Sequence, residues 1–440
     1  MPEVTATSAE HLFATGRPAE VPGPHYGATP AGYEPLKSFG SVPDGWLWGV
    51  ATAAHQIEGG NINNDWWLFE HTPGSGTKEP SGDACDSWNR WREDFQLVKD
   101  MGLDSYRFSL EWSRIEPAQG EFSVVALDHY RDMMIAAHEM GLKASVTFHH
   151  FTTPQWAADQ GGWTNPAIVE WFERYVARTV AHLGEHIDIA ATFNEPNIVA
   201  MVGYVAGAFP PGIKGDLKGY REATENFVAA HHAAREALKQ GPGKFPIGLT
   251  LAMSDTVIYP GESYEGGVRP TLAPPDTPDT EFAYLMSTAF LEAARGDDYI
   301  GVQTYMTQHI GLAGGELAKP DGWRFTSMDW NFTPEALGET VRTAFAIAGV
   351  PVIVTENGLA TDDDSDRIEY YSRSLTALRA AMDDGVDVRG FFAWSLLDNF
   401  EWAEGYRPKF GFVEVDRESF ERTPKPSSRW YAGVVAASRS

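Results

Sequence analysis

The sequence has little cysteine, little positive charge and no long apolar run. One cysteine, Cys85, among 440 residues excludes an intrachain disulfide framework and fits either a reducing compartment or a protein indifferent to redox state. Lys and Arg number 34 against 61 Asp and Glu, which gives a formal net charge of -27. Because such a surface repels phosphate backbones and anionic lipid headgroups, we expect no nucleic-acid partner and no membrane partner.

No apolar run approaches the roughly 20 residues that a membrane-spanning helix needs. Residues 1–40 lack the basic stretch followed by an apolar stretch that marks a signal peptide. We therefore expect a cytoplasmic protein with two parts: an N-terminal extension over residues 1–40, flexible or draped on the fold, and one large domain over residues 41–440. An oligomer is neither indicated nor excluded.

Beyond Trp46, short apolar segments alternate with longer amphipathic segments, which is the pattern of βα units. The predicted strands are 48–53, 105–110, 143–148, 187–193, 246–251, 299–305, 351–355 and 390–395. The predicted helices are 88–101, 127–140, 167–183, 220–239, 334–348 and 367–383. Eight βα units predict the α/β class and a single (β/α)8 barrel with long loops at the C-terminal face of its strands.

An open, doubly wound sheet is the competing architecture. Its first strand would lead into a Gly-rich phosphate turn, whereas here residues 49–54 read GVATAA and lead into Gln56 and Glu58. Two stretches, 261–280 and 308–330, are predicted insertions after the fifth and sixth strands. Long loops at this face often shape specificity, although a plain surface excursion explains the first stretch equally well.

Two glutamates stand at the exits of predicted strands, Glu195 in TFNEP (192–196) and Glu356 in VTENG (354–358). A breaker follows each almost at once, so each side chain should lie at the strand end where catalytic groups gather in a parallel barrel. Cleaving an acetal between sugars needs one carboxylic acid to protonate the leaving oxygen and one carboxylate to attack or to activate water. A lone Glu at a strand end is weak support, since Glu also caps helices and pairs with Arg.

These two motifs share the chain with WGVATAAHQIEG at 48–59, YRFSLEWSRI at 106–115 and FFAWSLLDNFEW at 391–402. Together, and in this order, the five motifs resemble glycoside hydrolase family 1 over nearly all of the chain after residue 41. The resemblance implies a retaining β-glycosidase on a (β/α)8 barrel, with Glu195 as general acid/base and Glu356 as nucleophile. Retention requires the two carboxyl groups about 5 to 5.5 Å apart, with their pKa values pushed apart.

The resemblance also implies the residues around this pair. Arg107 would hold Glu356 as an anion, and Tyr305 would donate a hydrogen bond to it. Asn194 would contact the sugar 2-hydroxyl. The implied sugar-binding residues are hydroxyl partners, further donors and aromatic platforms, namely Gln56, Glu401, His150, Trp402, Trp394 and Phe410.

Glu401 bears on the substrate. Family members that act on 6-phosphoglycosides usually lack this Glu and carry phosphate-binding residues nearby, so Glu401 favours an unphosphorylated sugar. We expect a β-glucoside, with β-galactosides and β-fucosides as further substrates. The plant thioglucosidase branch has Gln at the acid position, where this chain has Glu195.

We expect no cofactor and no metal. Adjacent strand residues point to opposite faces, so His149 and His150 cannot bind one ion from one side, and His231 with His232 fails similarly on a helix. His149 is expected to pack or to support its neighbours. The acidic stretch 362–366 is interpreted as a solvated loop.

Some positions depart from the family pattern. Phe151 stands where Trp is usual, and Gln303 and Thr304 replace the Asn and first Tyr of an Asn-Tyr-Tyr pattern. These changes leave the fine structure of the aglycone side open. Trp163 and Trp323 are candidate aglycone contacts, and a purely structural role fits each of them equally well.

The leading hypothesis is an exo-acting β-glucosidase that works by double displacement on a small β-glycoside or an oligosaccharide. A transglycosylating enzyme of the same architecture is the close alternative, because the sequence does not show how the aglycone site partitions water. A catalytically silent carbohydrate-binding barrel is disfavoured by the intact Glu195, Glu356, Arg107 and Tyr305. An inverting hydrolase would need a wider gap between the carboxyl groups.

Overall fold

The computed structural model describes residues 16–270, 284–311 and 316–439. Eight strands close into a parallel barrel in the order β11-β12-β2-β3-β4-β5-β6-β9. They are β2 (Leu47–Ala51), β3 (Ser105–Ser109), β4 (Lys143–His150), β5 (Ile189–Asn194), β6 (Ile247–Ala252), β9 (Tyr299–Thr304), β11 (Val352–Asn357) and β12 (Val388–Trp394). The predicted α/β class and single (β/α)8 barrel are confirmed, and every predicted strand overlaps an observed one.

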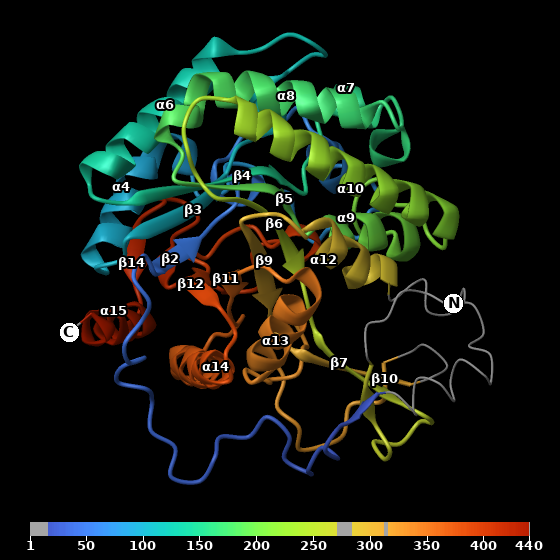
Figure 1. The fold of residues 1–440 in the computed structure, drawn as a ribbon, viewed down its shortest axis with the longest axis vertical. Helices are drawn as coiled ribbons and strands as arrows, with labels where there is room; N and C mark the ends of the chain where they lie inside the picture. Colours follow the sequence, from blue (N-terminus) through green and yellow to red (C-terminus); the bar gives the residue numbers. More distant parts are fainter. Residues whose placement is uncertain (1–15, 271–283, 312–315, 440) are drawn as a thin grey trace.

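Long helices cover the outside of the barrel, α4, α6, α8 and α10 along one side and α13, α14 and α15 along the other (Figure 1). They are α4 (Ser87–Asp100), α6 (Val124–Glu139), α8 (Ile168–Leu183), α10 (Leu217–Gln240), α13 (Ala336–Ala348), α14 (Asp364–Asp383) and α15 (Pro426–Ser438). In α8 the buried residues Ile168, Phe172, Tyr175 and Thr179 recur at three- and four-residue spacing, so one face of the helix packs inward. The sequence did not predict α15.

Short elements complete the loops. The short helices are α2 (Ala54–Ile57), α3 (Asp65–Glu70), α5 (Trp112–Ile115), α7 (Gln155–Ala158), α9 (Pro196–Met201) and α12 (Ala289–Ala293). An antiparallel pair, β13 (Val413–Val415) with β14 (Arg422–Pro424), precedes α15. The barrel strands β3, β5, β9 and β11 are buried at every position, which explains why they lack the alternation of buried and exposed residues that a half-buried strand shows.

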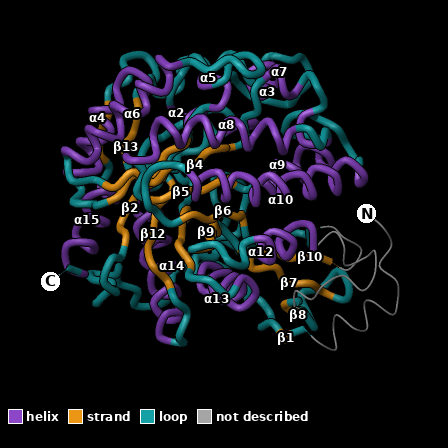
Figure 2. The backbone as a smooth tube through the Cα atoms, turned by 45° about the horizontal axis from the view of Figure 1, so that its top comes forward, coloured by secondary structure: helices purple, strands orange, loops and turns teal. Residues whose placement is uncertain are grey.

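A second sheet stands beside the barrel, near α12 and α13 (Figure 2). Its strand order is β1-β8-β7-β10, from β1 (Arg17–Pro18), β7 (Asp255–Tyr259), β8 (Val268–Arg269) and β10 (Thr307–Gly311). β7 and β10 follow the barrel strands β6 and β9 and pair in parallel with each other. The two predicted insertions therefore help to build this sheet, although residues 271–280 of the first and 312–315 of the second lie outside the described residues.

Residues 16–40, here called the strap, run along the outside of the molecule from the second sheet past α14 to α15 (Figure 1). Arg17 pairs with Arg269 of β8. The Leu36 amide donates to Ser372 Oγ of α14 at 2.7 Å. The Phe39 amide donates to Ser438 Oγ of α15 at 3.1 Å. Residues 1–15 of the predicted extension lie outside the described part of the chain.

The barrel closes where its last strand meets its first. β12 pairs with β2 from Gly390 opposite Leu47 to Trp394 opposite Ala51. This seam is tight at Gly49, where an added Cβ would lie 2.5 Å from the Phe392 ring. Across residues 16–270, 284–311 and 316–439, no helix is both long and apolar enough to cross a membrane.

Candidate active site

Both glutamates lie at the carboxyl ends of barrel strands, each beside a break in strand pairing. Glu195 directly follows β5, whose register with β6 shifts between Ala191 and Asn194. Glu356 lies near the end of β11, whose register with β9 shifts between Val354 and Glu356. Such irregularities re-aim side chains at barrel rims. Glu195 is 8% exposed and Glu356 is 3% exposed, so both carboxyl groups are almost withdrawn from solvent.

The backbone around the mouth is held in an unusual conformation. Phe151 (φ 69°), Glu195 (φ 47°) and Trp402 (φ 50°) all adopt the left-handed region. Residues other than glycine adopt this region at a cost and persist there only where the surrounding structure determines it, often at functional sites. The acid candidate is therefore oriented by its packing and not by its own backbone preference.

Arg107 of β3 links Glu356 to Asn194. Its Nη1 lies 2.5 Å from Glu356 Oε1, and its Nη2 lies 2.7 Å from Asn194 Oδ1. Tyr305, directly after β9, donates a hydrogen bond from its hydroxyl group to Glu356 Oε2 at 2.6 Å. Each oxygen of the Glu356 carboxylate thus accepts a hydrogen bond, and the structure brings these four predicted residues together.

Two residues that were not among the predicted site residues support Asn194. Gln303 Nε2 lies 2.8 Å from Asn194 Oδ1, and Thr250 Oγ1 lies 3.1 Å from the same oxygen. Gln303 also donates to Thr250 at 3.1 Å. With Arg107, three donors converge on one amide oxygen and fix its direction. Thr250, in the middle of β6, carries no sequence signal that would distinguish it from a packing residue.

Gln303 and Thr304 have surroundings that the sequence did not indicate. Gln303 contacts Asn194 inside the barrel, whereas the Thr304 hydroxyl lies 2.6 Å from the Thr340 hydroxyl of α13, on the outside. The reason is that successive residues of a strand point to opposite faces. The first change therefore modifies the support of Asn194, and the second modifies the packing of a helix.

Asn194 in turn determines the tautomer of His150. Arg107 carries donors only, so Asn194 must present Oδ1 to it and Nδ2 to His150 Nε2, which is 3.1 Å away. His150 Nε2 then accepts, and the ring proton resides on Nδ1, a buried atom with no partner among the described residues. Burial, and next the charge of Arg107, lower the pKa of His150 well below its usual range. His150 is therefore a neutral ring with an N–H group to offer. Its neighbour His149 packs edge-on against Trp163 instead.

Burial and neighbouring charges give the carboxyl groups of Glu195 and Glu356 different pKa values. Burial raises the pKa of Glu195 well above its usual range, and the charge of Glu356 raises it further. Burial also raises the pKa of Glu356 above its usual value, but the charge of Arg107 and the hydrogen bonds from Tyr305 and Arg107 oppose the rise and keep it smaller than that of Glu195. These contacts favour the anion at Glu356 and leave the proton on Glu195. A protonated acid beside an anionic carboxylate is the starting state that glycoside cleavage needs.

The predicted hydroxyl partners lie on the β12 side of Glu356. Gln56 Nε2 donates to the Phe400 carbonyl at 2.8 Å and lies 3.4 Å from Glu401 Oε2. Gln56 Oε1 is buried with no partner among the described residues. Burial, and next the charge of Glu356, raise the pKa of Glu401 to about 8. Unpaired buried polar atoms are costly, and a ligand that supplies partners relieves the cost.

Aromatic rings line the same region. The rings of Trp394 and Trp402 lie 6.0 Å and 6.1 Å from the His150 ring and nearly parallel to it. Phe410 meets Tyr305 edge-on at 6.1 Å. The six predicted substrate-binding residues are therefore gathered around the two glutamates.

Trp330 is a site residue that the sequence analysis missed. Its ring lies 5.5 Å from Tyr305 and 6.3 Å from Phe410, and it is partly exposed. It reaches this position on an antiparallel turn, residues 323–332, closed by the bridge between Phe325 and Asn331. Its place at the end of the predicted insertion 308–330 was the one signal that could have identified it.

Trp163 and Trp323 have structural surroundings. Trp323 is buried among Tyr26 and Tyr264, with ring centroids 4.6 Å and 4.7 Å away. Trp163 is buried and stacks on Phe227 at 3.7 Å. Of the two roles considered for each, the packing role is the one that the structure supports.

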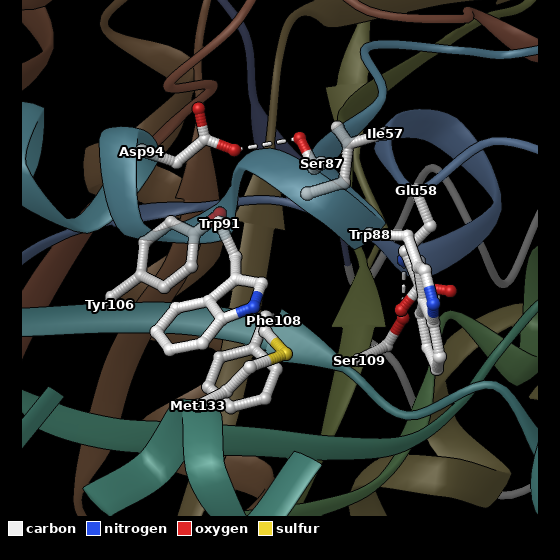
Figure 3. A pocket seen from close by; sticks show the side chains of 11 residues that line it. Ile57, Glu58, Ser87, Trp88, Trp91, Asp94, Tyr106, Phe108, Ser109 and Met133 are labelled. Carbon is white, nitrogen blue, oxygen red and sulfur yellow. Dashed lines mark hydrogen bonds between the residues drawn. The ribbon is translucent and has the colours of Figure 1, made fainter. Parts of the chain in front are cut away.

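A small cavity of about 10 Å³ lies apart from this site, between β3 and the helices α4 and α6 (Figure 3). Tyr106 and Phe108 line it, whereas Arg107 between them points into the barrel. The cavity is thus on the opposite face of the strand from the glutamates. Among the described residues, no group of three or more His, Cys, Asp or Glu is placed to hold a metal ion.

Comparison with known proteins agrees with this geometry. The sequence profile of glycosyl hydrolase family 1 matches residues 38–266 and 293–439. The chain belongs to this family. As a family 1 member it is a glycoside hydrolase. Beta-glucosidase A of Thermotoga maritima is 33% identical to it over 89% of this chain and 97% of that protein. The beta-glucosidase of an Agrobacterium species is 31% identical over 90% and 95%.

Solved structures of beta-glycosidases are also similar to this family 1 chain. The beta-glycosidase BGL167 superposes with a TM-score of 0.80 and 41% identity, covering 91% of this chain and 98% of that one. The beta-glucosidase of Thermotoga maritima in complex with glucoimidazole superposes with a TM-score of 0.81 and 28% identity, covering 92% and 100%. Residues 1–37, which include most of the strap, fall outside the family profile.

Proposed function

We propose that this glycoside hydrolase is a retaining exo-β-glucosidase that acts on unphosphorylated β-glucosides, with β-galactosides and β-fucosides as further substrates. One observation carries the proposal: Arg107 and Tyr305 bond the two oxygens of Glu356, while burial and the charge of Glu356 keep a proton on Glu195. The two relatives, which align with this chain over nearly their whole length, are named beta-glucosidases, and these names support the substrate class.

In the first displacement, a Glu356 carboxylate oxygen attacks the anomeric carbon as the glycosidic C–O bond breaks. Glu195 gives its proton to the departing oxygen, so the aglycone leaves as a neutral alcohol and Glu195 becomes an anion. Arg107 and Tyr305 keep the attacking carboxylate ionised and oriented before the bond forms.

In the second displacement, Glu195 takes a proton from water, and the water oxygen attacks the anomeric carbon of the Glu356 ester. The ester C–O bond breaks, the carboxylate is restored, and the sugar leaves with its original configuration. The charge of Glu356 is absent while it is esterified. Glu195 then loses one of the causes that raise its pKa, which suits its change from acid to base.

The remaining groups account for sugar recognition. Asn194 Nδ2 would contact the 2-hydroxyl, and the unpartnered His150 Nδ1 and Gln56 Oε1 would meet other hydroxyls. Glu401 would accept hydroxyl protons and repel a 6-phosphate. We also propose a reducing, cytoplasmic setting, in line with the single, buried Cys85.

Turnover of 4-nitrophenyl β-glucoside, β-galactoside, β-fucoside and β-glucoside 6-phosphate tests the proposal. We expect wild-type activity on the unphosphorylated sugars, loss in Glu356→Ala, and recovery with azide to give an α-glycosyl azide. Added methanol measures transfer against hydrolysis through the yield of methyl β-glucoside. A wild type inert on all four compounds, or a Glu356→Ala variant at full rate, would overturn the proposal and favour a carbohydrate-binding barrel.

A further inference from the structure

We propose that the strap sets the leaving-group specificity of the site by holding the Trp330 turn, residues 323–332, in place. The inference rests on the proposed β-glycosidase function. It concerns residues 16–30, a segment that the family profile does not cover and that contacts neither glutamate.

The strap contacts the base of the Trp330 turn, that is, Trp323 and Arg324. The Arg324 amide donates to the Tyr26 carbonyl at 3.0 Å, and the Tyr26 ring packs on Trp323 at 4.6 Å. Thr29 Oγ1 donates at 2.8 Å to Glu369 Oε2 of α14, and Arg324 Nη1 donates to the same oxygen at 3.0 Å. Strap, turn base and α14 are thus joined at one carboxylate.

The turn transmits this position to the site. The Phe332 amide donates to the Arg324 carbonyl at 3.0 Å, and the Thr326 amide donates to the Trp330 carbonyl at 2.8 Å. These cross-links make the turn a rigid unit, so a shift at its base moves its tip. At the tip, the Ser327 amide donates at 3.0 Å to the carbonyl of Ala360, in the loop that follows Glu356.

Trp330 stands on the opposite side of Glu356 from Gln56 and Glu401. β11, which carries Glu356, lies between β9 and β12 in the barrel. Gln56 and Glu401, the hydroxyl partners, lie on the β12 side, whereas Trp330 lies on the β9 side against Tyr305. A partly exposed indole there offers a flat apolar surface to an aglycone and none to the sugar hydroxyls.

Gly27 of the strap packs closely against the turn. It has φ +79°, and an added Cβ would lie 2.6 Å from the Phe332 carbonyl oxygen. Gly32, also in the strap, has φ +73° with nothing within 4 Å of an added Cβ. Substitution to Ala therefore costs both positions similar backbone strain, and only the one at Gly27 pushes the strap off the turn.

The experiment compares Gly27→Ala, Gly32→Ala and wild type on two substrates, 2-naphthyl β-glucoside and β-glucosyl fluoride. In the proposed binding mode the naphthyl group contacts the indole ring of Trp330, and fluoride is too small to do so. We expect Gly27→Ala to change the ratio of the two kcat/KM values by about fivefold or more, because small displacements of positioning groups have large effects on rate. Gly32→Ala keeps the wild-type ratio. The single variant Trp330→Ala should also change the ratio of the two kcat/KM values. Adding Gly27→Ala to Trp330→Ala should change that ratio no further.

Several results would overturn the inference. A folded Gly27→Ala variant with the wild-type ratio, an equal loss on both substrates, or the same change in Gly32→Ala each shows that the strap only stabilises the fold. If Gly27→Ala does not fold, Tyr26→Leu, which removes the contact with Trp323 without backbone strain, is held to the same criteria. A wild type that turns over neither glucoside removes the proposed function as well, which distinguishes that failure from an active wild type with indifferent variants.

Discussion

Gln303 Nε2 lies 2.8 Å from Asn194 Oδ1, so a side chain that departs from the family pattern supports the amide expected to meet the sugar 2-hydroxyl. Replacing Gln303 by Leu removes one of three donors to that oxygen and leaves Asn194 freer to rotate. We expect kcat/KM on a β-glucoside to fall about tenfold, the cost of roughly one hydrogen bond.

A matched substrate identifies the route of this effect. On a 2-deoxy-β-glucoside, which lacks the hydroxyl that Asn194 would bind, Gln303→Leu should match wild type closely. Gln303→Asn, which restores an amide, should recover part of the loss on the β-glucoside. Equal losses on both substrates would mean that Gln303 supports the barrel and not the sugar contact.

Arg107→Lys separates charge from geometry at the nucleophile. Lysine keeps the positive charge but cannot bond Glu356 and Asn194 together as the guanidinium does. With the hydrogen bond to the anion lost, the pKa of Glu356 rises, so the acid limb of the pH profile of kcat/KM moves to higher pH. We expect kcat to fall about 100-fold. Arg174→Lys, at a partly exposed arginine that pairs with the buried Glu116, should leave the acid limb in place. An unmoved limb in Arg107→Lys would show that the guanidinium does not control ionisation of the nucleophile.

Glu356→Gln tests the coupling of the two carboxyl groups. Burial is the larger cause that raises the pKa of Glu195, and the charge of Glu356 is the second. Removing that charge should lower the pKa of Glu195 while leaving it above the value of an exposed Glu. Carbon-13 NMR titration of labelled Glu side chains measures the shift directly in the inactive variant. An unchanged titration of Glu195 would mean that the two groups do not interact.

Glu401 links catalysis to stability. Its pKa is raised to about 8 by burial, whereas Glu in an unfolded chain titrates near about 4.3. Between these pH values the folded protein keeps a proton that the unfolded chain has lost, so this group lowers the free energy of unfolding as pH rises. Glu401→Gln should therefore gain Tm relative to wild type between pH 5 and pH 9, by differential scanning fluorimetry. Glu418→Gln, at an exposed position between β13 and β14, is the control, and a constant Tm difference for Glu401→Gln would refute the expectation.

Much of the fold followed from the sequence because barrel strands are buried on both faces. Segments such as Val352–Asn357 begin with a short apolar run, here Val352–Val354, and lie between breakers, which are visible without coordinates. The second sheet was not visible in this way. Its strands β1 and β8 have two residues each, and Arg17 meets Arg269 only because the whole fold brings them together.

The site shows the same division. Glu195 and Glu356 were found because a breaker follows a buried strand, and the resemblance supplied their surroundings. The direction of Gln303 and the packing of Trp323 depend on which face of a strand or turn points inward, and a short sequence window does not contain that information. Trp330 lies in a loop, where neither strand nor helix periodicity applies.

The seam between β2 and β12 has a consequence for how the protein is made. The ribosome makes Leu47–Ala51 before, and Val388–Trp394 after, all the other barrel strands, yet these two strands are neighbours in the finished barrel. Until Val388–Trp394 has been made, the nascent chain therefore exposes an unpaired strand edge, the kind of surface that aggregates or engages chaperones. An active molecule can form only after β12 has been made. A message truncated before β12 yields a chain that contains both glutamates but cannot close the barrel around them.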